Sequence, residues 1–204
     1  MGKLVAADNW NASGAVRYRL LGSTGIEIGM DYSKAPVPTH FYFADYLSVD
    51  EDSFQVMFTF GKLDKPLTDT LRSKVEVYFN PVMFVKQFWV STREMHKVAK
   101  THLDAHGFTP VPPTALLTAP KVQTFEANQI SMLMTEGECI ADFFYLSPKD
   151  LFYKPQKNEK IDLEALVRII LSPPLVLSLL DRAQPIAEKL QPIYGDKNAN
   201  LESK

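Results

Sequence analysis

One pattern occurs twice along this chain of 204 residues and limits its fold more than any other feature. It consists of two β-prone runs around a turn, a third strand, a capping residue, a proline and an amphipathic helix. In the first copy the strand KVEVYF leads directly into Asn80-Pro81. Asn is a favoured N-cap and Pro is favoured at the first helical position, so we predict a helix from Pro81 to Gly107.

The second copy repeats this order. The stretch FEANQISMLMTEGECIADFFYL gives two β-prone runs around a turn at residues 135–138, and LEALVRIIL then leads into Ser172-Pro173. A second helix is predicted from Pro173 toward Ile193, and Pro185 inside it is expected to kink or split it. The loop SPKDLFYKPQKNEKID, before the third strand, is longer than the corresponding loop of the first copy.

An alignment of the two copies supports an internal repeat. It sets Phe43-Ala44-Asp45 against Glu126-Ala127-Asn128, and Phe60 against Phe144. Turn, strand, cap and proline recur in the same order, although few identities remain. We therefore predict an α+β fold with two repeated antiparallel β-β-β-α units, an N-terminal β-hairpin, and both helices packed on one sheet face.

The remaining segments precede and connect these units. The stretch AVRYRLLGSTGIEIGMDY predicts a hairpin from Ala15 to Tyr32, and FTPVPPTALLTAPK, with four prolines, predicts a linker. The predicted organisation is a lead-in with the hairpin (1–40), a first unit (41–107), a Pro-rich linker (108–124), a second unit (125–195) and a disordered tail (196–204).

The two units resemble a family of small uncharacterised bacterial and archaeal proteins, each about one unit long. The pattern of that family is a Y-A-N opening, a central F-G and a V-x-S-P-E-H-A helix start. The matching segments are Phe43-Ala44-Asp45, Phe60-Gly61 and Asn80-Pro81 in the first unit, and Ala127-Asn128 and Ser172-Pro173 in the second. Phe144-Tyr145 replaces F-G in the second unit, and Glu-His is absent from both.

This resemblance covers residues 41–107 and 125–194 and implies no activity. In the order of elements alone, the chain also resembles the SecB-like export chaperones, which place an antiparallel sheet before helices and form oligomers. That second likeness is an analogy at the level of the fold.

Composition narrows the class of protein further. The 22 basic and 24 acidic residues leave a net charge of −2, without the basic excess that non-specific nucleic-acid binding requires. The only cysteine, Cys139, excludes an intrachain disulfide. No apolar run is long enough for a signal peptide or a bilayer span, so we predict a cytoplasmic protein that does not enter membranes.

The sequence contains no Gly-rich phosphate loop, nucleophile elbow or kinase-like motif set, so we predict a non-enzyme without a cofactor. His102 and His106 have a spacing that can present two imidazoles to one metal. No third ligand lies near them in sequence, and the helix dipole favours histidine in a last turn, so no metal site is predicted. His96 is expected at the edge of the core with its hydrogen bonds satisfied.

Two other groups also have a structural interpretation. Cys139 lies among Glu136, Glu138 and Asp142, whose charges would raise the pKa of its thiol, so we expect a buried, unreactive side chain. The acidic set Asp45, Asp50, Glu51 and Asp52 could bind a cation, but it lacks the regular spacing and central glycine of a calcium loop, and we interpret it as a solvated turn.

The predicted function is protein binding or assembly, in the manner of a chaperone, with a protein partner or self-association. The second helix starts with PPLVLSLL, which is apolar on every side, and such a helix is normally buried on every side. The predicted interface is Leu175, Val176, Leu179 and Leu180, with Trp89 of the first helix. The alternative is a small-molecule or nucleotide-binding regulatory protein with its pocket between the two units.

Overall fold

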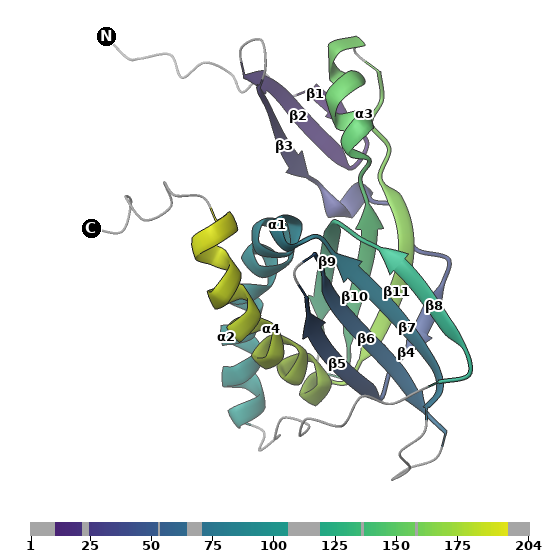
Figure 1. Ribbon diagram of the computed structural model, residues 1–204. Coiled ribbons are helices and arrows are strands. Elements are labelled where there is room, and N and C mark those ends of the chain that lie inside the picture. The colour runs from purple at the N-terminus through teal and green to yellow at the C-terminus, as the bar shows by residue number, and fades with distance from the viewer. Residues whose placement is uncertain are drawn as a thin grey trace. The chain divides into compact units, whose positions relative to one another are not determined.

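The computed structural model describes residues 11–21, 25–52, 54–64, 71–105, 119–135, 137–157 and 159–195 (Figure 1). These residues form several sheets together with helices, which confirms the α+β class. The chain divides into a smaller unit, residues 1–37 and 146–165, and a larger unit, residues 38–145 and 166–204. The larger unit therefore includes strands and helices from both expected copies.

The smaller unit contains an antiparallel sheet of β1 (Asn11–Ser13), β2 (Val16–Leu21) and β3 (Gly25–Met30). The expected hairpin is present as β2 and β3. A 3-10 turn, η1 (Tyr32–Lys34), follows β3. Gly14 has a φ of 60° in the turn between β1 and β2, a conformation that glycine adopts without strain.

The long loop expected before the third strand of the second copy is in fact partly helical. It contains α3 (Pro148–Tyr153) and a 3-10 turn, η3 (Pro155–Lys157). The Ser147 hydroxyl accepts the Asp150 N–H at 3.3 Å, and Pro148 occupies the first helical turn. Ser-Pro is the same start signal that predicted the second long helix, so this short helix could have been read from the sequence.

The larger unit contains two four-stranded sheets, with orders β4-β11-β10-β9 and β5-β6-β7-β8. The strands of the first sheet are β4 (Phe41–Phe43), β11 (Glu164–Leu171), β10 (Cys139–Tyr145) and β9 (Gln129–Met134). Those of the second are β5 (Tyr46–Glu51), β6 (Val56–Leu63), β7 (Leu71–Phe79) and β8 (Val122–Glu126). β4 is parallel to β11 and β8 is parallel to β7, so each sheet takes one strand from the other copy.

The chain crosses from one sheet to the other at Ala44-Asp45. The Ala44 N–H donates to the Ile170 carbonyl of β11 at 3.0 Å. The next N–H, that of Asp45, donates to the Gly61 carbonyl of β6 at 3.0 Å. Two successive backbone groups therefore belong to different sheets.

The second crossing, at Ala127-Asn128, has the same geometry. The Ala127 N–H donates to the Tyr78 carbonyl of β7 at 2.9 Å, and the Asn128 N–H donates to the Phe144 carbonyl of β10 at 3.1 Å. At the Ala-Asp and Ala-Asn pairs of the sequence motif, the chain thus leaves one sheet and enters the other.

These hydrogen bonds correct the alignment of the two predicted copies by one residue. The Gly61 and Phe144 carbonyls have the same role, so Phe60 corresponds to Phe143 and not to Phe144. From the sequence alone, either Phe143 or Phe144 could correspond to Phe60. The two choices differ by one residue, which changes the face of the sheet that each side chain occupies. Phe60 and Phe143 are both buried in the core.

Both expected helix starts are present. Asn80 caps the first helix through its Oδ1, which accepts the Val82 N–H at 2.9 Å. The helix continues as α1 (Pro81–Met83), a π-helical segment η2 (Phe84–Trp89) and α2 (Val90–Ala105). The second helix, α4 (Pro173–Tyr194), is not split at Pro185; it changes direction along its length (Figure 1), as a proline inside a helix causes.

Each helix packs against a strand of the other copy. α4 contacts β5, whereas η2 and α2 contact β9, and α2 also contacts α4. One apolar cluster joins both sheets and both helices. Its centre is aromatic: the Phe58 ring lies 4.6 Å from that of Phe88 and 5.7 Å from that of Phe79, measured between centroids.

Candidate protein-binding surface

Each sheet of the larger unit has one edge strand in contact with a helix. On β5, the Arg182 guanidinium of α4 donates to the Leu47 carbonyl, and Lys189 of α4 pairs with Glu51. On β9, the contacts come from η2 and α2. Covering an edge in this way prevents it from pairing with another chain.

The opposite edge strands, β4 and β8, are largely exposed. Just before β4, the His40 carbonyl accepts the Arg168 N–H at 2.8 Å, and just after it the Ala44 N–H donates to β11. Because alternate residues of a parallel strand bond to the same neighbour, the N–H and C=O groups of Phe41 and Phe43 face away from β11. Their side chains are 55% and 60% exposed. β4 therefore presents two aromatic rings together with backbone groups that have no strand beside them in the part of the chain that the structure describes.

An apolar row crosses the outer face of this sheet. Leu133 lies opposite Ile140, and Ile170 lies beside Phe43. Asp142 of β10 pairs with Arg168 of β11, and these two strands run in opposite directions (Figure 1). Two residues further along from this pair, in opposite senses on the two strands, Ile140 lies beside Ile170. We call Leu133, Ile140, Ile170 and Phe43 the apolar row. Its two ends, Leu133 and Phe43, are 61% and 60% exposed.

The corresponding row of the second sheet has the opposite chemistry. Asp50, Met57, Tyr78 and Glu126 take the places of Leu133, Ile140, Ile170 and Phe43, in that order. Each of the four is paired with the next across the sheet. We call it the acidic row, because exposed carboxylates replace Leu133 and Phe43 at its ends. Two sheets of the same topology thus carry different surfaces, and only one of these surfaces is apolar.

Arg168, next to the apolar row, is already neutralised. Its Nε and Nη2 donate to the two carboxylate oxygens of Asp142 at 2.6 and 2.7 Å, which raises the pKa of the guanidinium above its ordinary value. The same guanidinium lies 5.6 Å from the centre of the Phe41 ring. Asp142 therefore neutralises the positive charge of Arg168 within the sheet itself.

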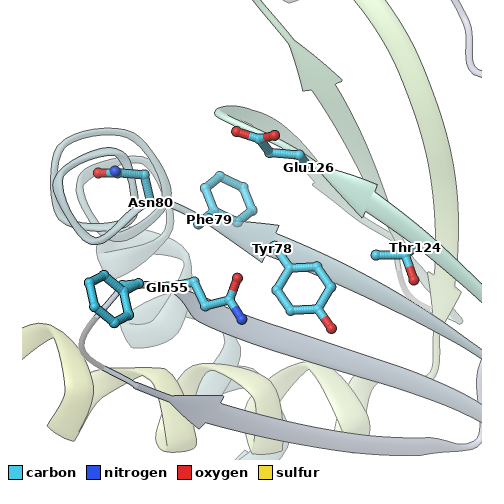
Figure 2. A pocket seen from close by; sticks show the side chains of 7 residues that line it. Gln55, Tyr78, Phe79, Asn80, Thr124 and Glu126 are labelled. Atoms are coloured by element: carbon cyan, nitrogen blue, oxygen red, sulfur yellow. The ribbon is translucent and has the colours of Figure 1, made fainter.

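A pocket of about 410 Å³ lies beside the other exposed edge, that of β8 (Figure 2). It is lined by Phe54, Gln55, Tyr78, Phe79, Asn80, Thr124 and Glu126. The Tyr78 hydroxyl donates to Glu76 Oε2 at 2.9 Å. Burial, this hydrogen bond and the negative charges of Glu76 and Asp52 raise the pKa of Tyr78 to about 12.

The interface expected on the second helix is corrected by the structure. Leu175, Val176, Leu179 and Leu180 are buried within the single chain, so they offer no surface to a partner. The helix is apolar on every side because β5 lies against one side and the first helix against another. Trp89 is partly buried and also packs against the core.

The histidines behave in part as expected. His96 Nε2 lies 2.7 Å from Asp181 Oδ1, which links α2 to α4 and confirms a satisfied histidine at the edge of the core. His106 and the side chain of His102 lie outside the described residues. Within the described ranges, no group of three His, Cys, Asp or Glu side chains could hold a metal ion.

Cys139 is fully buried, and burial alone raises the pKa of its thiol to about 12. The direction agrees with the expectation, but the cause is desolvation and not the neighbouring acids. In the acidic turn, Asp52 Oδ1 accepts the N–H groups of Phe54 and Gln55 at 2.7 and 2.9 Å. This carboxylate therefore fixes the turn, as the sequence indicated.

Comparison of the chain with family models, with curated proteins and with solved structures found no match. None of the helices described is both long and apolar enough to cross a bilayer.

The exposed edge of β4 was not among the predicted sites, although the sequence contained a signal for it. Residues 35–44 include three consecutive aromatics and no Asp, Glu, Lys or Arg. Exposed edge strands usually carry charges that prevent pairing with other chains. An aromatic strand without such charges is typical of an edge that accepts another strand.

Proposed function

We propose that the chain is a non-catalytic protein-binding component, which takes an extended segment of another protein along β4. The observation that carries this proposal is the exposed edge at Phe41 and Phe43, where outward backbone groups and aromatic side chains occur together. Strand addition uses backbone hydrogen bonds for affinity and side-chain contacts for specificity. A segment beside β4 would find both.

The apolar row extends the contact beyond the edge. A bound segment that alternates apolar and polar residues would set its apolar side chains next to Phe43, on the face of the sheet that also carries Ile170. This surface selects neither acidic nor basic partners, because Arg168 and Asp142 neutralise each other. Such tolerance suits a component that binds many unfolded segments, in the manner of a chaperone, or one that assembles with one partner.

The test measures binding of labelled 12-residue peptides by fluorescence anisotropy. Phe43→Lys sets a charge on the β4 edge and is expected to weaken binding by at least about tenfold, through lost apolar burial and desolvation of the lysine. Glu126→Lys is the matched control, since Glu126 has the corresponding position on β8. Peptides N-methylated on the residues that face β4 should also bind poorly, because they cannot complete the ladder.

Two results would contradict the proposal. One is equal binding of the same peptides by wild type and Phe43→Lys. The other is binding that N-methylation leaves unchanged, which would exclude strand addition.

A second candidate, a regulator that binds a small molecule, is favoured by the pocket in Figure 2. Residues 54–55 and 78–80 of the first predicted unit line it, together with Thr124 of the predicted linker and Glu126 of the second predicted unit. A ligand in this pocket should raise the melting temperature of the protein in proportion to its occupancy. The buried thiol of Cys139 is consistent with either function in a reducing compartment such as the cytoplasm.

A further inference from the structure

We infer that the pocket beside β8 binds a cationic group, an ammonium or a guanidinium, between aromatic side chains and the carboxylate of Glu126. This inference deepens the second candidate function and rests on it, since it names the class of ligand. It is independent of the proposed binding at β4, which lies in the other sheet.

Aromatic side chains line two parts of the pocket. Phe54 is 83% exposed, an unusual position for a phenylalanine, and Asp52 holds the turn that presents it. Tyr78 contributes the second ring; in Figure 2 its hydroxyl points away from Gln55 and Asn80. The faces of such rings carry partial negative charge and attract cations.

The charges around the pocket favour the same ligand. Glu126 has no ion-pair partner in the part of the chain that the structure describes, and the lining includes no Lys or Arg. Glu76 is already occupied, because it pairs with Lys74 at 2.6 Å and accepts the Tyr78 hydroxyl. Glu126 is therefore the carboxylate left to receive a cation from outside.

The size of the pocket limits the ligand to one side chain or a small amine. A volume of about 410 Å³ is at the lower end for ligand sites. The neutral polar groups of Gln55, Asn80 and Thr124 can take up the hydrogen bonds of an ammonium or a guanidinium. Two sources have this chemistry: a free amine, or a Lys or Arg of a protein segment that lies along the exposed β8.

The test follows the backbone and side-chain amides of Gln55 and Asn80 by NMR during titration. The cationic probes are N-acetyl-arginine methylamide, N-acetyl-lysine methylamide and cadaverine, and the neutral probes are the citrulline and norleucine amides. We expect saturable shifts with the cations in the millimolar range, and Glu126→Gln or Phe54→Ala should weaken them about five- to tenfold. Glu138→Gln is the matched control, because Glu138 holds the position of Gln55 in the other copy.

The outcomes distinguish selectivity for cations from small-molecule binding in general. If citrulline and arginine amides bind equally well, the pocket binds small molecules but its selectivity for cations is overturned. If no probe shifts these amides at ~10 mM, both the inference and the second candidate function are overturned. If cations bind, a strand-forming peptide that contains lysine is compared with cadaverine. Tighter binding of the peptide identifies a protein segment as the source of the cation, and tighter binding of cadaverine identifies a free amine.

Discussion

The rings of Phe60 and Phe143 lie with their centroids 5.8 Å apart and hold corresponding positions in the two sheets. This contact joins the sheets at the centre of the core. Replacing either residue by Ala should lower the free energy of unfolding by about 3–5 kcal/mol, and the double variant should lose less than the sum. Urea denaturation measures both values.

The exposed Val90, changed to Ala, serves as control and should alter stability by less than about 1 kcal/mol. Strictly additive losses at Phe60 and Phe143 would show that the two rings do not support each other.

Leu175 and Leu179 should behave as core residues. Changing both to Asn buries two polar groups among apolar neighbours, which should cost several kcal/mol and unfold the chain. Circular dichroism and analytical ultracentrifugation follow folding and association together. Ile193→Asn, on the exposed side of the same helix, should leave both unchanged. A folded double variant that merely dissociates would restore the helix as an interface.

Replacing Thr59 by Val should stabilise the folded protein. Among the described residues its hydroxyl is a buried oxygen without a hydrogen-bond partner, and Val keeps the shape while removing the unpaired group. Thr59→Val should raise the free energy of unfolding by about 1 kcal/mol. The buried Thr92 donates to the Phe88 carbonyl at 2.8 Å, so Thr92→Val should lower it by a similar amount. Thermal denaturation of both variants distinguishes these signs, and a loss at Thr59 would reveal a partner for its hydroxyl.

Cys139 should make the protein less stable as the solution becomes alkaline. The pKa of a cysteine thiol is about 8.5 in the unfolded chain, and burial raises the pKa of Cys139 to about 12 in the folded protein. Below pH 8.5 both states are protonated and the group contributes nothing. Between about pH 8.5 and 12 the unfolded state loses its proton first, so the free energy of unfolding should fall by up to ~1.4 kcal/mol per pH unit.

The comparison is with Cys139→Ala, whose stability should fall less steeply over the same range. In the native protein the thiol should also react slowly with Ellman's reagent at pH 8. Equal pH slopes for both proteins, or rapid labelling, would show that the thiol is accessible to solvent.

The local order of elements could be predicted from the sequence, because caps and prolines act on neighbouring residues. Asn80-Pro81 and Ser172-Pro173 begin helices as expected. The exchange of β4 and β8 between the sheets could not be predicted, since strand pairing depends on contacts between distant segments. The burial of Leu175 was missed for the same reason: an apolar helix looks alike whether its own chain or a partner covers it.

The proposed binding surface could be predicted only in part from the sequence. The aromatic run around Phe41 was visible, but its place at an exposed edge follows from the pairing of β4 with β11. The sequence alone does not show that Phe43 of β4 and Glu126 of β8 occupy corresponding positions in the two sheets. Without that correspondence, the contrast between an aromatic and an acidic edge cannot be recognised.

The pairing of β4 with β11 also fixes the order of events while the chain is made. Synthesis delivers Phe41–Phe43 long before Glu164–Leu171, so the aromatic strand leaves the ribosome without the neighbour it will join. The first sheet cannot close until the last strand emerges, and pairings so distant in sequence form slowly. During translation, Phe41–Phe43 therefore stays without its pairing strand until Glu164–Leu171 has been made.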